Sequence, residues 1–542
     1  MRHDGIFRIT PHPSGTAKGD MAEMGMKAFD LVRMARIGLP VPPAFVLGTP
    51  HCRRWYREPE RFGKGLASLL EEQLRWLQSA TDLGLGDTRK PLLVSVRSGA
   101  PVSMPGMMDT LLNIGLCDAT VHGLLRITGN PRLVWDSYCR LIRSFAEVVY
   151  GAAPQPFAAA LDTMLIRERV DRFQDLDYLN LAELSQTCLQ IFNDLTGQPF
   201  PQNPLKQLEL AVHAVFASWN SPRAVEYRRL HGIPDDLFTA ATIQRMVFGN
   251  AGGTSGSGVG FTRDPDSGEK RLYFDFLFNS QGEDIVSGRA IGSDAEQLFT
   301  ILPETGRELN AICDALEMEF RDAQEFEFTI QDGVLYLLQT RSAKRTEWAA
   351  LRIAVEQTGE GLIERDEALA RLDGLELDKI MRRRLSLEGQ QPLCQGQPAG
   401  IGVAIGPLAF DIDAARRLSS DEGEAAVLVR EEMSTDDISG IALSAGVLTA
   451  KGNRTSHAAV VARQLGKPCI CGCGGLRIDP ERHFAVFGER SLTEGETITL
   501  DSNTGRVYAG AAAIVIERPE EWLNEIRKWR RSAHTGNTRP RS

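Results

Sequence analysis

The segment GVLTAKGNRTSHAAVVARQLG, residues 446–466, decides how the second half of this sequence folds. An apolar run and a glycine turn lead into a helical pattern, with Thr455 and Ser456 as capping residues and His457 in the first turn. Gly466 is placed to end that helix. A neutral imidazole there can attack phosphorus, and the acquired phosphate would meet the positive end of the helix. The segment predicts a strand–turn–helix unit with His457 as the catalytic residue; a purely structural histidine is the alternative.

A glycine-rich stretch, Gly249–Gly258 (GNAGGTSGSG), follows the apolar run Met246-Val247-Phe248. Its glycines and three hydroxyl residues form a loop whose N–H groups can approach polyphosphate oxygens without obstruction by Cβ atoms. No Gly-Lys-Ser/Thr follows, so the loop is not of the Walker A type. We predict a phosphate-binding loop, with a merely flexible loop as the alternative. Its candidate binding residues are Gly252, Thr254, Ser255 and Gly256.

Two carboxylates, Glu325 and Glu327, alternate with phenylalanines in the pattern EFEF. In a strand, both carboxylates project to one face while the phenylalanines face the core. Hard oxygen ligands on a rigid strand suit Mg²⁺ held between protein and nucleotide phosphates, so both are candidate metal ligands. The solvent face of an edge strand is the alternative. The strand should end in a hairpin turning at Asp332-Gly333, and the return strand carries Gln339 and Arg341 at the same alternation.

Cations are needed to neutralise bound phosphates, and three basic residues lie beside expected strand or helix ends. Lys27 belongs to a helix-then-strand pattern over residues 20–48. Arg97 lies near the end of the short apolar strand PLLVSVRSG, residues 91–99. Arg341 lies on the second strand of the hairpin. Adjacent strands that carry acidic and basic residues under a glycine-rich loop are typical of ATP-grasp sites.

The chain has 542 residues and a mass of 59.7 kDa, which is too long for one hydrophobic core and predicts two to four domains. Apolar residues recur at helical spacing between about 117 and 232. Residues 346–390 are charged and helical, and Arg382-Arg383-Arg384 within them is most simply a solvated linker face. From about 395 to 510, small residues and tight turns predict a compact second α/β unit.

The bulk composition excludes several classes of protein. A hydrophobic fraction of 42% and a charged fraction of 24% are those of an ordinary globular protein. A net charge of −10 argues against a general nucleic-acid or membrane-surface binder. No apolar run is long enough to cross a bilayer, and we expect a cytoplasmic protein with neither nucleic acid nor membrane as a partner.

Two local patterns have simple structural interpretations. The nine cysteines are scattered, so we expect no disulfide framework. Cys469, Cys471 and Cys473 alternate, which predicts buried thiols on one face of a strand and does not match a zinc knuckle. Near the end of the sequence, an apolar stripe occupies one face of a helix and either packs back on its own domain or binds an acceptor protein. The stripe consists of Trp522, Ile526 and Trp529.

Five segments in collinear order closely resemble the pyruvate, phosphate dikinase family. Together they run from about residue 20 to about 510, and the combination of VSVRSG, SMPGMMDT and TSHAAVVAR is highly specific. The segments are 92–116, 246–270, 279–288, 325–346 and 454–474.

The resemblance implies an enzyme with a donor domain, a carrier domain and an acceptor domain. An ATP-grasp domain donates phosphate, a swivelling domain carries it on histidine, and a TIM barrel passes it to pyruvate. By motif position, His457 matches the phosphohistidine and Thr455 matches a threonine modified by a regulatory kinase in some relatives. The residues that match ATP-site positions are Lys27, Arg97, Glu327, Gln339 and Arg341.

The sequence departs from the family pattern in four places. No segment resembles the barrel, so the phosphoenolpyruvate site is expected to be missing. The family's Gly-Gly-Lys-Gly reads Gly25-Met26-Lys27-Ala28, and Gly253 stands where the phosphate loop of relatives has a carboxylate. The family's Gly-Glu pair is Phe274-Asp275, and Glu325 replaces the usual Asp. The cations and the histidine are retained.

The expected architecture is therefore a multidomain α/β protein with four segments. These are an ATP-grasp domain over 1–345 with a helical insertion at about 117–232, a helical linker over 346–391, a small swivelling phosphohistidine domain over 392–510, and a helix and tail over 511–542.

The expected function is phosphorylation of His457 that depends on ATP and Mg²⁺, with inorganic phosphate as a second acceptor. Transfer to pyruvate is expected only with a separate barrel protein. One alternative is a phosphotransferase with a different acceptor. The other is a non-catalytic nucleotide-binding regulatory subunit or decoy of a full-length dikinase.

Overall fold

Strand β3 (Val94–Gly99) explains how the first sheet forms, because its side chains alternate between an apolar and a polar face. Val94 and Val96 are buried in an apolar core, whereas Arg97 points to the opposite face. The sheet has the order β1-β2-β5-β3-β4, and all neighbouring strands are antiparallel. The other strands are β1 (Ile6–Ile9), β2 (Ala44–Leu47), β4 (Thr110–Ile114) and β5 (Ala240–Arg245).

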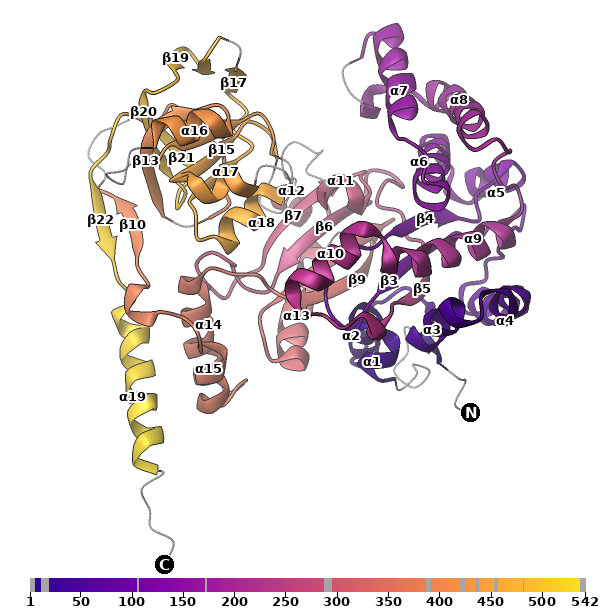
Figure 1. Cartoon of the computed structure of the whole chain (residues 1–542), viewed down its shortest axis with the longest axis horizontal. Helices are drawn as coiled ribbons and strands as arrows, with labels where there is room; N and C mark the ends of the chain where they lie inside the picture. Colours follow the sequence, from indigo (N-terminus) through magenta and orange to yellow (C-terminus); the bar gives the residue numbers. More distant parts are fainter. Residues whose placement is uncertain are drawn as a thin grey trace, which may run out of the picture. The chain divides into compact units, whose positions relative to one another are not determined.

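The computed structural model separates into two compact units (Figure 1). The first contains Met1–Gly253 and Ile330–Thr340, and the second contains Thr254–Thr329 and Arg341–Ser542. The structure describes residues 5–10, 19–104, 107–170, 173–286, 295–386, 391–400, 402–419, 425–433, 438–452, 457–480 and 482–536.

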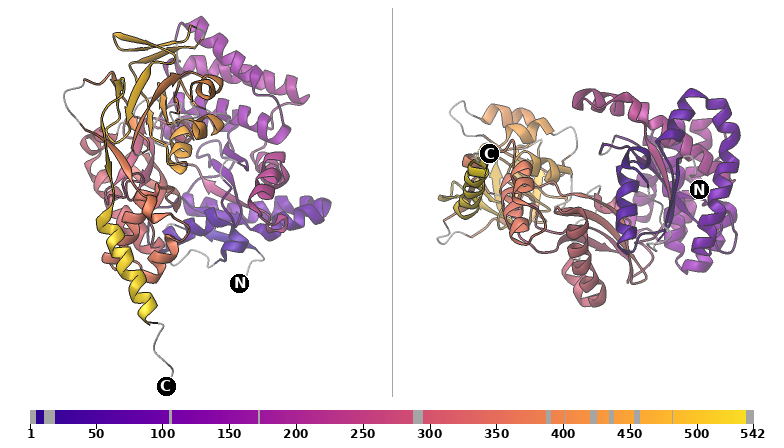
Figure 2. Two further views of the ribbon diagram at one scale, coloured as in Figure 1. Left: turned by 60° about the vertical axis from the view of Figure 1, so that its left-hand side comes forward. Right: turned by 90° about the horizontal axis from the view of Figure 1, so that it is seen from below.

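Helices gather around the strands of the first unit (Figure 2). The predicted helical region between about 117 and 232 is confirmed as α5 to α10. Side chains of Asn130, Asp177, Asn203 and Ser221 cap helices there by accepting a backbone N–H three residues on. The helices of this unit are α1 (Met21–Met24), α2 (Met26–Arg36), α3 (Thr49–Arg57), α4 (Pro59–Thr81), α5 (Asp118–Thr128), α6 (Pro131–Tyr150), α7 (Gln155–Glu168), α8 (Tyr178–Thr196), α9 (Pro204–Ala217) and α10 (Pro222–His231).

A four-stranded sheet has the order β7-β6-β8-β9. Its strands are β6 (Gly256–Phe261), β7 (Tyr273–Phe278), β8 (Gln324–Gln331) and β9 (Val334–Ser342). The predicted hairpin between β8 and β9 is confirmed, since Asp332 and Gly333 both have positive φ, at 51° and 79°. Positive φ at two successive residues is the conformation of a tight two-residue hairpin.

Glycines of β6 lie opposite aromatic residues of β7. Gly256, Gly258 and Gly260 pair with Phe278, Phe276 and Phe274. A Cβ at Gly258 would clash with the ring of Phe328, and one at Gly260 would clash with Phe326. The predicted inward orientation of these two β8 phenylalanines is confirmed, because each is 1% exposed. The alternating glycines therefore make room for a core of stacked rings.

A buried ion-pair network joins the end of β6 to the helices around it. Arg263 is fully buried, and its Nη2 lies 2.8 Å from Glu317 Oε2. It also pairs with Glu356 and Glu360 at 3.0 and 2.9 Å. Arg263 and Glu317 are both buried and compensate each other's charge, whereas Glu356 and Glu360 are partly exposed, at 28% and 31%. The helices of this part of the chain are α11 (Gly282–Val286), α12 (Ala295–Ile301), α13 (Pro303–Phe320), α14 (Glu347–Gly359) and α15 (Arg365–Arg371).

The remaining large sheet has the order β11-β21-β20-β13-β14-β15-β16-β12. Strands β13 to β16 run parallel, and three helices between them cover one face (Figure 1). The helices are α16 (Ile412–Leu418), α17 (Ile438–Leu443) and α18 (His457–Gln464). The strands are β11 (Cys394–Gln395), β12 (Gln397–Pro398), β13 (Val403–Ala409), β14 (Val427–Arg430), β15 (Gly446–Thr449), β16 (Cys469–Cys471), β20 (Thr497–Asp501) and β21 (Arg506–Ala509).

Two smaller β elements and a final helix complete the second unit. Strands β17 (Leu476–Asp479), β18 (Phe484–Phe487) and β19 (Arg490–Thr493) form an antiparallel sheet. Strand β10 (Arg382–Leu385) pairs with β22 (Ile514–Glu517), and α19 spans Glu520–Gly536.

The expectation that the arginine run is helical is wrong, because these residues form strand β10. The expectation of a solvated face is confirmed at Arg383 and Arg384, which are exposed. The Arg382 side chain makes a two-point ion pair with Glu517, at 2.8 and 3.1 Å. Its guanidinium also lies 4.4 Å from the centre of the Trp348 ring. The pairing with β22, more than a hundred residues later, overrides the local helical pattern.

The cysteine prediction is confirmed at two positions and wrong at the third. Cys469 and Cys471 are free, buried and on β16. Gly472 then turns the chain with a φ of 67°, so Cys473 leaves the strand. Cys473 instead forms a disulfide with Cys394, 79 residues earlier. Local spacing carries no information about such a distant partner.

The apolar stripe of α19 packs back on its own unit, which confirms the first of the two interpretations. Ile526 and Trp529 are buried, and Trp522 packs partly against the same cluster. The cluster is completed by Leu523 of the same helix and by residues of α14 and α15, including Trp348. The stripe is therefore part of the unit's core.

One buried carboxyl in the first unit should make the folding stability of the chain depend on pH. Burial raises the pKa of Asp30 in α2 from 3.8 to about 7, although the charge of Arg33 acts in the opposite direction. The folded chain therefore holds a proton that the unfolded chain releases near its ordinary pKa. Stability should fall as pH rises between about 4 and 7 and stay reduced above that range.

Asp30→Asn removes this ionisation, so thermal melts at about pH 5 and about pH 8 should show a gain in stability that is larger at the higher pH. Asp162→Asn, at an exposed position on α7, is the matched control and should show no such trend. A difference between Asp30→Asn and the parent chain that does not change with pH would contradict the assignment.

Candidate functional site

Helix α18 begins at His457, as the sequence predicts, and connects parallel strands β15 and β16. The carboxyl ends of parallel strands share one edge of a sheet, and the loops after them form the usual ligand-binding crevice of such sheets. The backbone of His457 follows β15 at that edge. Its side chain, together with Thr455 and Ser456, lies outside the residues that the structure describes.

Gly466 ends α18 as predicted. It has a φ of 63°, and its N–H donates to the carbonyl of Arg463 at 3.1 Å. The N–H of Lys467 donates to the carbonyl of Ala462 at 2.8 Å. These two bonds form a Schellman motif, which fixes where the helix stops. The length of the helix is thereby set from its carboxyl end.

Arg463 anchors α18 through a buried ion pair that the sequence analysis missed. Its Nε lies 2.8 Å from Oδ1 of Asp266, and the Arg463 side chain is 1% exposed. Burial acts to lower the pKa of Arg463, but the charge of Asp266 raises it above its ordinary value. The carbonyl of Asp266 accepts a hydrogen bond from the Thr346 hydroxyl at 2.7 Å. No local signal could reveal this pair, because its members lie 197 residues apart.

Two further cations lie at the carboxyl edge near the start of α18. Arg430 ends β14 and donates from Nη1 to the carbonyl of Phe410 at 3.2 Å. Lys451 follows β15, and its Nζ lies 2.8 Å from Oε1 of Glu431. Neither residue was predicted from the sequence. The rule that parallel strands share their carboxyl edge could have pointed to both.

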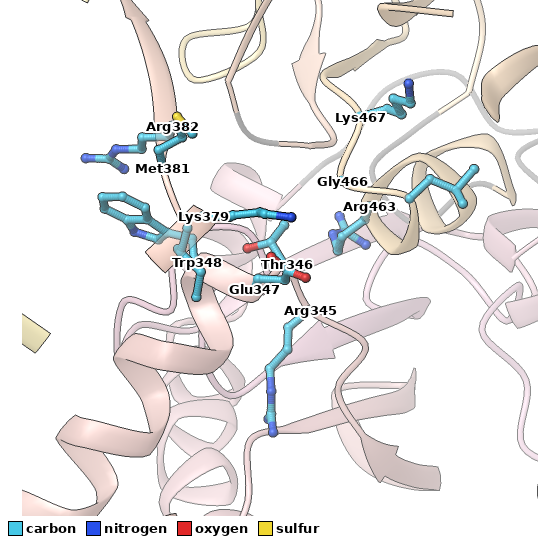
Figure 3. A pocket seen from close by; sticks show the side chains of 12 residues that line it. Arg345, Thr346, Glu347, Trp348, Lys379, Met381, Arg382, Arg463, Gly466 and Lys467 are labelled. Atoms are coloured by element: carbon cyan, nitrogen blue, oxygen red, sulfur yellow. The ribbon is translucent and has the colours of Figure 1, made fainter. Parts of the chain in front are cut away.

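A cavity of about 300 Å³ lies beside the carboxyl end of α18 (Figure 3). Several cations line it, but its arginines are paired within the protein, since Arg345 binds Asp322 at 2.7 Å and Arg382 binds Glu517. Figure 3 shows these two arginine side chains pointing away from each other. The arginines of this cavity therefore have their charge compensated by carboxylates.

In the first unit, the structure brings Arg97 and Gln339 together. Arg97 donates from Nη1 to the carbonyl of Leu338 at 2.9 Å and from Nη2 to Oε1 of Gln339 at 3.0 Å. These contacts place the guanidinium on the polar face of the β1–β5 sheet, where Thr242 is its neighbour across the strands. Two residues predicted from separate strand patterns are thus in contact.

Lys27 lies beside Gly99, the last residue of β3. An added Cβ on Gly25 would lie 1.9 Å from the carbonyl oxygen of Gly99, so only glycine fits at the start of α2. An added Cβ on Gly99 would lie 3.8 Å from Lys27 Cβ. The Lys27 side chain therefore starts beside Gly99, which follows Arg97 by two residues in β3. Met26 and Ala28 belong to the regular helix α2.

The glycine-rich loop divides between the two units. Gly252 has a φ of 150° and open space where a Cβ would be, and Gly253 and Thr254 are exposed. Ser255 is buried, and the Gly256 Cα faces the ring of Phe276 closely enough to exclude a side chain. Packing alone thus accounts for glycine at position 256, whereas Gly252 satisfies a backbone requirement on an open loop.

In the second unit, Arg341 pairs with Glu325 through its Nη2. Burial acts to lower the pKa of Arg341, but the charges of Glu325 and Glu327 raise it above its ordinary value. Lys344 belongs to the same electrostatic cluster, because burial and the nearby charge of Arg341 both lower its pKa. Lys344 was not predicted from the sequence, although it follows the strand that carries Gln339 and Arg341.

The carboxylates fit a metal that is held mainly by substrate. Within the described part of the chain, no group of three or more His, Cys, Asp or Glu side chains could hold an ion on its own. Mg²⁺ usually takes one or two protein carboxylates and completes its shell with phosphate oxygens and water. Glu325 and Glu327, on alternate positions of β8, suit that mode.

Comparisons with known proteins connect these two regions to defined domains. The family described as "Pyruvate phosphate dikinase, AMP/ATP-binding domain" matches residues 66–292, and "PEP-utilising enzyme, mobile domain" matches residues 422–505. The first range contains Arg97 and the glycine-rich loop, and the second contains α18. The chain thus combines a nucleotide-binding region with a region found in PEP-utilising enzymes.

Relatives over nearly the whole chain bear the same name. The chain is 40% identical over 532 residues to pyruvate, phosphate dikinase of Rhizobium meliloti (strain 1021), covering 95% of this chain and 59% of the relative. It is 41% identical over 491 residues to that of Clostridium symbiosum, covering 90% and 56%. For chloroplastic pyruvate, phosphate dikinase 1 of Arabidopsis thaliana, identity is 40% over 533 residues, covering 96% and 55%.

The chain is similar to pyruvate, phosphate dikinases over the part of their length that it spans. It spans between 55% and 59% of these three relatives. Among the described helices, none is long and apolar enough to cross a membrane.

Proposed function

We propose that this chain transfers phosphate from ATP to its own His457. The observation that carries the proposal is the start of α18 at His457, at the carboxyl edge of four parallel strands and within the region matched to a PEP-utilising mobile domain. A phosphorylated imidazole at that position would meet the N–H groups at the start of α18 and the positive end of its dipole. The ATP-grasp and swivelling arrangement of relatives is part of this proposal.

The donor site is proposed to use positioning and charge neutralisation rather than covalent chemistry. Lys27, Arg97 and Arg341 would bind phosphate oxygens, and Gln339 would orient Arg97 through their hydrogen bond. Glu325 and Glu327 would hold Mg²⁺, which neutralises charge on the phosphates when it is bound. The loop residues Gly252, Thr254, Ser255 and Gly256 would contribute backbone N–H and hydroxyl donors.

By analogy with the family, the transfer runs in two steps. The imidazole nitrogen of His457 attacks the β-phosphorus of ATP, and the bond between that phosphorus and the oxygen of the α-phosphate breaks. AMP leaves, and a pyrophosphoryl group remains on the histidine. Inorganic phosphate then takes the terminal phosphoryl group, which releases pyrophosphate and leaves one phosphate on His457. Thr455 is a proposed position for regulatory phosphorylation beside it.

The final acceptor is proposed to be pyruvate only where a PEP- and pyruvate-binding barrel is present, for example on a separate protein. A different acceptor remains the enzymatic alternative. The non-catalytic alternative is suggested by Gly253 in the phosphate loop and by Phe274, whose ring packs against Phe299 and Phe328. The experiments below distinguish catalysis from nucleotide binding alone.

The donor site is tested by Arg341→Ala. A charge-assisted hydrogen bond contributes about 1.5–3 kcal/mol, so the dissociation constant for ATP, measured by calorimetry, should rise by about tenfold or more. Arg341→Lys keeps the charge beside Glu325 and should lose less. Arg307→Ala, which removes an exposed arginine from α13, is the control and should bind ATP like the parent. An unchanged dissociation constant in Arg341→Ala would place the nucleotide elsewhere.

The carrier residue is tested by His457→Asn with ATP radiolabelled at the β- or γ-phosphorus. The parent chain should acquire acid-labile label, and the variant should acquire none while binding ATP normally, because asparagine lacks a nucleophilic ring nitrogen. His213→Asn and His483→Asn should label like the parent. Label persisting in His457→Asn would overturn the assignment, and a parent chain that binds ATP without labelling would favour the regulatory alternative.

A further inference from the structure

Helix α6 holds the first part of the glycine-rich loop by side-chain hydrogen bonds. Asn130 caps α6, and its Oδ1 accepts the N–H of Leu133 at 3.0 Å. Its Nδ2 donates to two successive loop carbonyls, those of Asn250 and Ala251, at 3.2 Å each. The side-chain oxygen meets a donor and the nitrogen meets two acceptors, so one orientation of the amide satisfies every contact.

A second contact fixes the same turn of the loop. Asn250 is 8% exposed, and its Nδ2 donates to Oδ2 of Asp136 at 3.1 Å. The other oxygen of Asp136 accepts from Nε of Arg140 at 2.6 Å, and Asp136 is 6% exposed. Just before the loop, the N–H of Phe248 donates to Oε1 of Gln331 at 3.0 Å. The loop therefore enters from β5 in a single, buried arrangement.

The planarity of the peptide bond determines the direction in which the N–H groups of this loop point. The described chain contains no cis peptide bond, and in a planar trans peptide the C=O and the following N–H point in opposite directions. Because the carbonyls of Asn250 and Ala251 point at Asn130, the N–H groups of Ala251 and Gly252 point away from α6. Two successive N–H groups on one side of a loop form a concave site for an anion.

We infer that Asn130 is a positioning residue for the polyphosphate of ATP, acting through the peptide groups of the loop. It holds two carbonyls toward α6, so the N–H groups of Ala251 and Gly252 are oriented toward the phosphates before ATP binds. Asp136 supports the same orientation through the side chain of Asn250. This inference rests on the proposed function, and it gives the helical region of the first unit a role in nucleotide binding.

The test replaces the Asn130 amide while keeping the helix cap. Asn130→Asp retains an oxygen for the Leu133 N–H but turns a carboxylate toward two carbonyls, and Asn130→Ser retains a capping hydroxyl without the amide donor. With Asn130→Asp, the dissociation constant for ATP should rise about tenfold, whereas that for AMP should change by less than about twofold. AMP lacks the two terminal phosphates. In Asn130→Asp, the KM for ATP in the labelling of His457 should rise together with the dissociation constant for ATP. The rate of labelling at saturating ATP should change much less.

Asn203→Asp is the matched control, because Asn203 caps α9 in the same helical region by accepting the Lys206 N–H at 3.1 Å. It should bind ATP and AMP like the parent. If Asn130→Asp fails to fold, Asn130→Ser carries the same expectation, and thermal melts identify which variant is folded.

Parent-like ATP binding by the folded Asn130 variants would overturn the inference and leave the proposed function intact. An equal loss of ATP and AMP affinity would also overturn it, since Asn130 would then only support the fold. A parent chain that binds neither nucleotide would overturn the inference and the proposed function together.

Discussion

The buried ion pair between Arg463 and Asp266 fixes helix α18, and the surroundings of that helix depend on it. Neither charge has access to enough water to be stable alone, so each requires the other. Arg463 lies on the helix that begins at His457, and Asp266 lies in the turn after β6, where Thr346 holds its carbonyl. The ion pair and the Schellman turn at Gly466 together determine where the helix lies and where it ends. The position of the His457 backbone follows from these two constraints.

In the β6–β8 region, the packing depends on glycines that lie opposite aromatic residues. Glycines at alternate positions of β6 leave space that aromatic rings of β7 and β8 fill, and Phe276 stacks on Phe328 with ring centres 5.9 Å apart. The residue between two aromatic positions of β8, Glu327, points to the opposite face by the alternation of the strand. A rigid aromatic core therefore supports the carboxylates and Arg341 on adjacent strands. Such preorganisation is what phosphoryl transfer by charge neutralisation requires.

Local patterns in the sequence predicted the elements that local forces determine. Three features follow from capping, turn or periodicity signals. They are the helix His457–Gln464 with its stop at Gly466, the hairpin at Asp332-Gly333, and the helices between about 117 and 232. The contact of Arg97 with Gln339 was not predicted, but both residues were selected from strand patterns. The family resemblance supplied the roles of these residues, which no local pattern could provide.

The two errors, and the omissions of Arg463 and Asn130, involve partners far apart in the sequence. The Arg382 run became a strand because β22 pairs with it, and Cys473 left its strand to bond with Cys394. Arg463 with Asp266 and Asn130 with the glycine-rich loop are likewise contacts between distant segments. Their energies depend on burial and on tertiary geometry, neither of which is encoded in a short window of residues.

Whether ATP phosphorylates His457 can be measured by peptide mapping after incubation with ATP, phosphate and Mg²⁺. Trypsin should release the peptide Thr455–Arg463, TSHAAVVAR, which contains one histidine and two hydroxyl residues. We expect the mass of this peptide to increase by one phosphoryl group. Fragmentation should place that group on His457, and mild acid should remove it. Phosphate that withstands acid and resides on Thr455 or Ser456, or an unmodified peptide despite bound ATP, would contradict it.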